Sequence, residues 1–332
     1  MNFVWQPDPV PGSETRIALA ARFWSRLAVL APALLLGGAA VVSIVLRDLY
    51  LAHAVTQATL LVLYVVSWDL YCTPSGDVSF GHALFIGAAA YGSGLLSTRS
   101  GLSPWLAVAT GAVLAAALGA LLGSLTLRLR GAYFAMLTMA AQIMLARAIF
   151  LFSGTFGGGE GVIGIPPLAS DPFAATAACV AVGMAVYAGA MAFRRSRLCL
   201  LLRASGADEA LARASGVRVW RDRTVGFALS AGMAGLAGAL HAHTAGQVTS
   251  ELAGEWLSSV IALLGLLGAG LGVAGAAWAG LAYVVLQQLL VPLGGYDAVL
   301  ISAVFLVWIW RVAVVHGGAE AQWMMRRVPV PS

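Results

Sequence analysis

The chain has 332 residues, of which 60% are hydrophobic and only 10% are charged, and its formal net charge is +5. Soluble domains contain about 25% charged residues, so this composition argues against a soluble protein and indicates one embedded in a membrane. All basic residues are arginines at the boundaries of apolar runs, which is not the aromatic-rich basic patch of a nucleic-acid-binding protein.

Apolar runs follow one another from residue 27 to residue 315, and most have the length of about 20 residues that a helix needs to cross the hydrocarbon. They predict an all-α polytopic membrane protein with about ten transmembrane helices, and eight as the lower limit. The predicted spans are 27–46, 51–70, 79–98, 104–127, 131–152, 173–193, 222–244, 254–272, 274–291 and 298–315. Residues 1–26 and 316–332 are expected to be cytoplasmic tails, the first too long and polar for the start of a cleavable signal peptide.

The distribution of arginines predicts the orientation. With ten spans and both termini inside, 16 arginines face the cytoplasm, including Arg128 and Arg130, whereas only Arg47 and Arg99 lie outside and Arg147 lies within a span. This bias is the positive-inside pattern of multi-pass proteins.

An irregular connection is expected at residues 73–85, where Pro, Gly, Ser and Asp run directly into an apolar segment. Such backbone occurs at membrane depth where it is buried in protein or lines a water-filled cavity, so the bend is a candidate for the substrate pathway. The candidate pathway residues are Asp77, Ser79, Gly81, His82 and Phe85. His82 either contacts substrate or holds the bend by a hydrogen bond to a backbone carbonyl. Asp69, near the cytoplasmic end of its span, is expected to be a solvated boundary residue.

A second irregular connection, residues 153–167, is rich in glycine and ends in two prolines, which predicts a loop on the outer face. It is either a flexible connector or a docking site for an external partner. The candidate docking residues are Gly157, Gly158, Gly159, Glu160 and Gly161.

The loop 194–223 contains eight arginines and is expected to be cytoplasmic. Helix-forming residues continue up to Gly216, which predicts a short helix that ends at this glycine. A partner protein could bind such a helix. In the spans that follow, Gly232, Gly235 and Gly238 predict close helix packing. The alternative for residues 264–275 is a helix that breaks or re-enters the membrane.

Four segments, in this order, resemble the permease subunits of the branched-chain amino acid (Liv-type) ABC importers, most closely the M-type permease. Residues 76–91 are similar to the motif G-x-x-S-x-G-H-A-x-F-x-x-G-A-Y, with one residue more before the tyrosine. Residues 127–138 are similar to the motif L-R-L-R-G-x-Y-x-A-x-x-T. The other two segments are the glycine loop 157–166 and the loop 202–216 with the helix at 227–240 that follows it. The resemblance covers about residues 60–290.

The resemblance implies a type II-like ABC importer permease with a coupling helix at about Ser205 to Gly216. The residues that would couple to the ATPase are Arg203, Asp208, Glu209, Ala210, Arg213 and Gly216. Glu209 and Gly216 are one residue further apart than in the classical E-A-A-x-x-x-G signature. Asp77 is uncommon at its position in the family and would change the electrostatics for a carboxylate substrate.

The implied partners are a second homologous permease, two ABC ATPase subunits, a periplasmic or extracellular substrate-binding protein and membrane lipid. ATP and Mg would be bound by the ATPases, so this chain is expected to bind no cofactor or metal. The implied location is the bacterial cytoplasmic membrane. The implied solute is a branched-chain amino acid or a related amino acid, amide or organic acid.

Two other classes of membrane protein fit the sequence less well. An autonomous secondary transporter would need acidic groups near the membrane midplane or inverted repeats, and few acids fall within the spans. A membrane enzyme would need motifs such as HExxH or GxSxG, and neither occurs. The chain has no lysine, so it has no phosphate-binding G-x-x-x-x-G-K-[ST] loop and is not expected to hydrolyse ATP.

Overall fold

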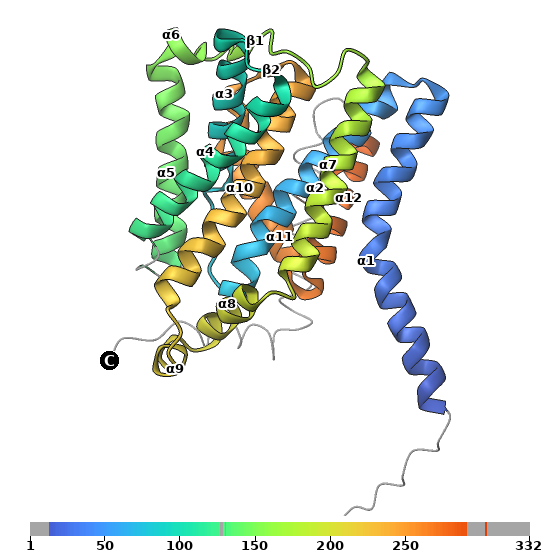
Figure 1. Ribbon diagram of the computed structural model, residues 1–332, viewed down its shortest axis with the longest axis vertical. Coiled ribbons are helices and arrows are strands. Elements are labelled where there is room, and N and C mark those ends of the chain that lie inside the picture. Colours follow the sequence, from blue (N-terminus) through green and yellow to red (C-terminus); the bar gives the residue numbers. More distant parts are fainter. Residues whose placement is uncertain (1–12, 127–128, 130, 291–302, 304–332) are drawn as a thin grey trace, which may run out of the picture.

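The computed structural model describes residues 13–126, 129, 131–290 and 303, and this part of the chain forms a bundle of helices (Figure 1). The long helices are α1 Ser13–Leu46, α2 Leu49–Ser75, α3 His82–Ser100, α4 Pro104–Thr126, α5 Ala132–Leu151, α7 Pro172–Phe193, α10 Val219–Ala245, α11 Glu255–Gly268 and α12 Val273–Leu290. Seven of the helices in these residues are long and apolar enough to cross a membrane. The predicted all-α polytopic class is therefore confirmed.

Nine of the ten predicted spans coincide with one of these helices, but a count of ten is not confirmed. Apart from residue 303, the span at 298–315 lies outside the described residues, as do Arg128, Arg130 and the tail 316–332. Two of the nine helices are not among the seven candidate spans: α3, a continuous helix that contains several glycines and serines, and α11. With 14 residues α11 is about 21 Å long, which is shorter than the hydrocarbon layer.

The first helix begins before the first predicted span. α1 begins at Ser13, inside the segment expected to be a tail, and continues past Pro32 to Leu46. In Figure 1 its N-terminal part extends well beyond the other helices. The part of α1 that is apolar enough to cross a membrane begins at Val29, close to the predicted start of the first span at residue 27. Residues 1–12 lie outside the described part, and the assignment of residues 1–26 to a cytoplasmic tail stays a prediction.

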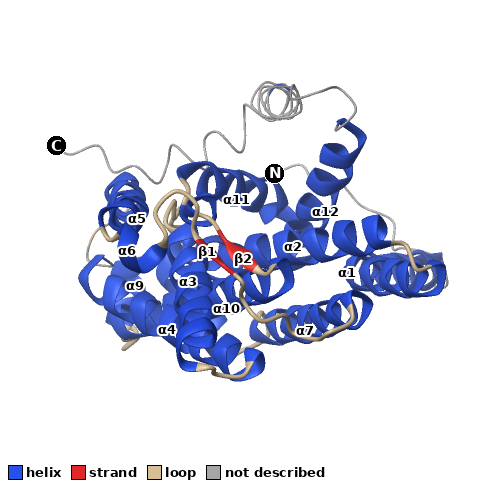
Figure 2. Cartoon of the chain, turned by 90° about the horizontal axis from the view of Figure 1, so that it is seen from above, coloured by secondary structure: helices blue, strands red, loops and turns tan. Residues whose placement is uncertain are grey.

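Short elements mark the two ends of the bundle. α8 Arg197–Ala207 and α9 Glu209–Ala214 lie at one end, which we call the inner end (Figure 1). The outer end carries α6 Ser153–Phe156 and the antiparallel pair of β1 Val162–Ile163 with β2 Gln247–Val248, which lies over the helices in the view from above (Figure 2).

Small residues bring α10 close to α3 and α4. A Cβ atom added to Gly232 would lie 3.2 Å from the Ala116 side chain, and one added to Gly235 would overlap the Ala115 side chain. Gly238 faces the backbone of Ile86 just as closely. The predicted close helix packing is thus confirmed for all three glycines.

The chain does break within residues 264–275. α11 ends at Gly268, a 3₁₀ turn η2 follows at Ala269–Leu271, and Gly272 has a φ of 66° before α12 begins. The backbones of Gly268 and Gly275 face each other across this turn. A second 3₁₀ turn, η1 Ser250–Ala253, separates β2 from α11.

Candidate functional site

The inner end of the bundle carries two consecutive short helices, and local hydrogen bonds explain their boundaries. The Ser196 side chain accepts the Cys199 amide at 3.2 Å and starts α8. The Asp208 carboxylate accepts the Leu211 amide at 3.0 Å and starts α9. The coupling helix expected from Ser205 to Gly216 is therefore interrupted, because Asp208 ends α8 and begins α9.

The predicted helix end at Gly216 is confirmed. This residue has a φ of 82°, its amide donates to the Arg213 carbonyl at 3.0 Å, and the Val217 amide donates to the Ala212 carbonyl at 3.0 Å. These two bonds form the Schellman motif, which favours glycine at the left-handed position. The chain is thus turned away from α9 at a fixed point.

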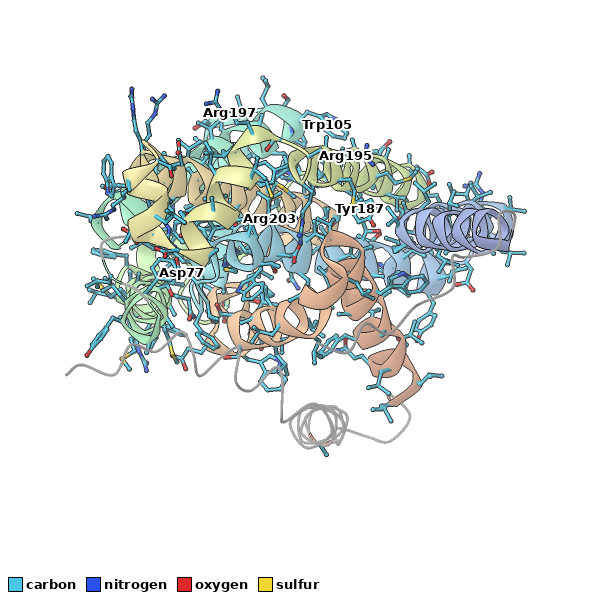
Figure 3. All side chains as sticks on the ribbon, turned by 90° about the horizontal axis from the view of Figure 1, so that it is seen from below. Asp77, Trp105, Tyr187, Arg195, Arg197 and Arg203 are labelled. Carbon is cyan, nitrogen blue, oxygen red and sulfur yellow. The ribbon has the colours of Figure 1, made fainter. Side chains whose placement is uncertain are left out.

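The surface of this segment mixes charged and apolar side chains. The predicted coupling residues that are exposed are Arg203, Asp208, Ala210, Arg213 and Gly216, whereas Glu209 is half-buried and forms an ion pair with Arg213. Leu200 on α8 and Leu211 on α9 are also largely exposed. Figure 3 views this end of the molecule and labels Arg195, Arg197 and Arg203 on it. A surface of arginines with protruding leucines suits contact with another protein.

The bend between α2 and α3 covers residues 76–81, of which Asp77, Ser79 and Gly81 are buried, Val78 and Phe80 are half-buried and Gly76 is exposed. Gly76 ends α2 with a φ of 73°. The Trp68 indole donates to the Ser79 carbonyl at 2.8 Å, and the Phe80 amide donates to the Thr138 hydroxyl at 3.2 Å. The irregular backbone is thus hydrogen-bonded by side chains of neighbouring helices, which is the arrangement that such backbone would need inside a membrane.

Gly81 permits the bend to touch α5. A Cβ atom at this position would lie 2.7 Å from the Thr138 carbonyl oxygen and 3.0 Å from its Cβ. No other residue leaves enough room there, which confirms close backbone approach as the reason for this glycine.

His82 joins three helices. Its Nε2 lies 3.0 Å from the Ser230 hydroxyl of α10, and that hydroxyl donates to the Ser67 carbonyl of α2 at 2.6 Å. The side chain is fully buried. The histidine therefore reaches a backbone carbonyl through a serine rather than directly, and it holds α3 against α2 and α10.

The other candidate pathway residues are also buried within this chain. Ser79 and Phe85 have no exposed surface, and the Phe85 ring packs edge-on against Phe227 with 5.4 Å between centroids. Assignment of these residues to a solute pathway stays a prediction.

Asp77 and Asp69 form two ion pairs at the inner end, which we call the inner ion pairs. Asp77 Oδ2 lies 3.0 Å from Arg223 Nη1, and the Arg223 side chain is only 2% exposed. Asp69 pairs with Arg194 and has no exposed surface, and it also accepts the Thr73 hydroxyl at 2.6 Å. The expectation of a solvated Asp69 is thus wrong, because an arginine from α7 covers it. Asp77 likewise faces a cation within the protein, which offsets its charge.

The glycine loop at the outer end contacts the end of α10 and is hydrogen-bonded to it. Gly161 has a φ of 77°, and a Cβ atom there would collide with the Val248 carbonyl of β2. The Ile165 amide donates to the Gly246 carbonyl at 3.0 Å, and Pro166 O lies 2.7 Å from His243 Nδ1. These contacts favour an ordered loop over a flexible connector. Whether Gly157, Gly158, Gly159 and Glu160 bind a partner stays a prediction.

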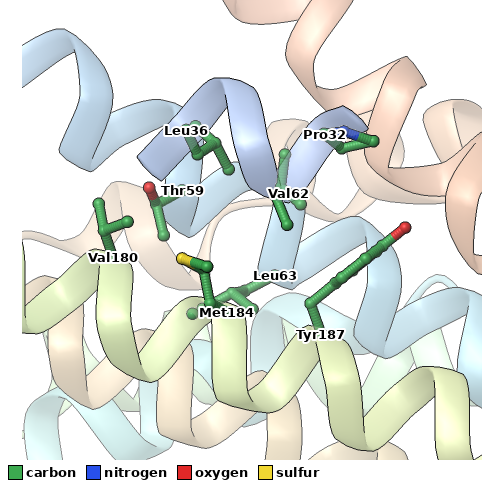
Figure 4. A pocket seen from close by; sticks show the side chains of 10 residues that line it. Pro32, Leu36, Thr59, Val62, Leu63, Val180, Met184 and Tyr187 are labelled. Atoms are coloured by element: carbon green, nitrogen blue, oxygen red, sulfur yellow. The ribbon is translucent and has the colours of Figure 1, made fainter. Parts of the chain in front are cut away.

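Two cavities lie away from the bend. One, of about 10 Å³, is lined mainly by apolar side chains of α1, α2 and α7 and has room for one water molecule at most (Figure 4). The other, of about 280 Å³, lies at the outer ends of α2, α7 and α10. Its polar lining residues are His53, Thr56, Ser170, Thr176 and Thr244.

Comparison with known proteins gives one result. A family model described as "branched-chain amino acid transport system / permease component" matches residues 50–310, well over half of the chain. No curated protein and no solved structure matches at a significant level.

Proposed function

Because the chain belongs to the family of branched-chain amino acid transport permease components, we propose that it is a membrane-spanning subunit of an ABC importer that moves a small polar solute into the cytoplasm. The solute would be a branched-chain amino acid or a related amino acid, amide or organic acid. Two ATPase subunits would bind and hydrolyse ATP, and a second permease would complete the pathway.

The single observation that carries this proposal is the α8–α9 segment at the inner end. Its helices have defined starts at Ser196 and Asp208 and a fixed end at Gly216, so it is a built surface and not a loose connection. The exposed Leu200 and Leu211 offer apolar contacts, and the arginines around them suit an acidic groove. We assign this surface to the ATPase.

The outer end would receive a substrate-binding protein. The glycine loop is held by β2 and the end of α10, so it presents a defined shape. The cavity of about 280 Å³ beside it is lined by apolar residues together with hydroxyl groups and a histidine, which suits a small solute that has both apolar and hydrogen-bonding groups.

Co-purification tests the proposal. The chain is expressed with the products of its genomic neighbours, and we expect two ATPase subunits to elute with it. Leu211→Asp should abolish this association, because it places a charge in the apolar part of the surface. Ile163→Asp is the matched control, since Ile163 is as exposed as Leu211 but lies at the outer end. Loss of ATPase in both variants, or in neither, would contradict the assignment.

The orientation is tested by labelling. A membrane-impermeant thiol reagent added to intact cells should label Ser153→Cys, at the outer end, and not Ala210→Cys, on α9. The three native cysteines are buried, so they add little background. Labelling of Ala210→Cys from outside would overturn both the orientation and the ATPase surface.

The second candidate, an autonomous secondary transporter, has less support. In the described residues Asp69 and Asp77 are buried acids, but both pair with arginines at the inner end and neither stands at the midplane as a proton or sodium site would. Uptake by vesicles that lack ATP but hold an ion gradient would favour this candidate.

A further inference from the structure

The inner ion pairs flank the α8–α9 segment in the sequence. Arg194 ends α7 before the segment, and Arg223 lies near the start of α10 after it. Both arginines bind acids at the same end of α2. Asp69 lies in the last two turns of this helix, and Asp77 lies two residues after its end. The segment is thus joined to α2 on both sides.

A third contact lies between these two. A Cβ atom on Gly206 of α8 would be 2.6 Å from the Ser75 carbonyl oxygen and 2.8 Å from that of Pro74, so α8 touches the end of α2 with its backbone. Arg223 also donates to the Ser75 carbonyl at 3.2 Å. The last residues of α2 are therefore held by α8 and by α10 together.

Burial makes these contacts resistant to separation. Asp69 and Arg223 have almost no contact with solvent, so removal of its partner leaves each of them a buried charge that is not compensated. Separation of the charges in such surroundings is unfavourable, and this opposes movement of the two ends of the α8–α9 segment away from the end of α2.

The end of α2 leads straight to the bend and to α3. Residues 76–81 connect the two helices, and His82 at the start of α3 is joined through Ser230 to α2. One continuous set of contacts therefore leads from α8 through the end of α2 to the bend and the start of α3.

We propose that the inner ion pairs are positioning contacts that transmit movement of the α8–α9 segment to α2 and the bend. This inference rests on the proposed function, in which an ATPase imposes that movement. It assigns Asp69, Asp77, Arg194 and Arg223 to coupling and not to solute recognition.

The test measures solute molecules transported per ATP hydrolysed, in proteoliposomes that contain the complete complex. Asp77→Asn and Arg223→Gln should each lower this ratio about tenfold while the ATPases still co-elute. The exchanged pair, Asp77→Arg with Arg223→Asp, should recover much of the ratio, because it restores opposite charges. Arg47→Gln is the control, since it removes an exposed ion pair at the outer end, and it should leave the ratio unchanged.

An unchanged ratio in the assembled single variants would overturn the inference, as would an equal loss in Arg47→Gln. If the single variants fail to insert into the membrane, the same ratio is measured for Arg223→Lys. Lysine keeps the positive charge but cannot bind Asp77 and the Ser75 carbonyl together as a guanidinium does. A fall of about threefold would support the inference, and a wild-type ratio would refute it. Absence of ATPase from the wild-type chain would refute the proposed function instead.

Discussion

The two ends of the bundle are held together in different ways. At the inner end, buried ion pairs join α7 and α10 to the end of α2, and the Arg223 side chain is only 2% exposed. At the outer end, Arg47 and Asp171 lie 4.0 Å apart with 70% and 49% of their side chains exposed. The outer loop is held mainly by backbone hydrogen bonds.

This difference matches what each end would have to do. The exposed Arg47–Asp171 pair contributes little and water can replace either partner, so no charge pair of this kind opposes a rearrangement of the outer end when a partner or solute arrives. At the inner end the paired charges are buried and are not replaced by water in the folded protein. We therefore expect the inner end to keep its geometry when a partner protein displaces it. Three comparisons between the ends test this contrast.

The largest effect is expected at the buried pairs. Asp69→Asn leaves Arg194 charged without its partner and should lower the free energy of unfolding in detergent by about 3–5 kcal/mol. Arg47→Gln at the outer end should cost less than about 1 kcal/mol. Chemical denaturation of both purified variants measures the difference. Equal costs would show that the two ends are held alike.

An intermediate effect is expected in the outer loop. Gly161→Ala combines an unfavourable φ with a collision against the Val248 carbonyl, and should destabilise the loop by about 2 kcal/mol. Gly164→Ala has the same φ strain with open space around it, so about 1 kcal/mol is expected. The rate of proteolysis within the loop, measured for both variants and compared with their global unfolding, distinguishes Gly161→Ala from Gly164→Ala. Identical cleavage rates would mean that the contact with β2 does not order the loop.

The smallest effect compares two helix ends. Gly216 ends α9 at the inner end and Gly101 ends α3 at the outer end, and both have positive φ with no atom near an added Cβ. Alanine at either position should cost about 1 kcal/mol. Only Gly216→Ala should reduce the ATP hydrolysis that is coupled to transport, because only α9 would contact the ATPase. Reduced coupling in Gly101→Ala would mean that the readout reports strain in general.

Much of the fold could be predicted from the sequence because each span is a local feature. An apolar run of sufficient length predicts a helix without knowledge of its neighbours, and Gly216 predicts a helix end for the same reason. The break at Asp208 could also have been predicted, because aspartate is a favoured N-terminal cap. The helix-forming residues on both sides of it instead favoured one uninterrupted helix.

The pairing of charges could not be predicted. Asp69 and Arg194 are 125 residues apart, and nothing in the sequence around either one indicates which acid a given arginine will meet. Eight arginines in the loop 194–223 offered many partners, and only the packing of α7 and α10 against α2 selects two of them. The two-residue strands β1 and β2 are likewise too short to show alternation.

α10 connects the two ends described above. It has 27 residues and is therefore about 40 Å long, with Arg223 near one end and β2 just beyond the other. A rigid rod of that length that tilts by about 10° around its midpoint moves each end by about 3.5 Å in opposite directions. That distance exceeds the tolerance of a hydrogen bond. Either the outer strand pair and the buried Asp77–Arg223 contact shift in concert, or one of them opens.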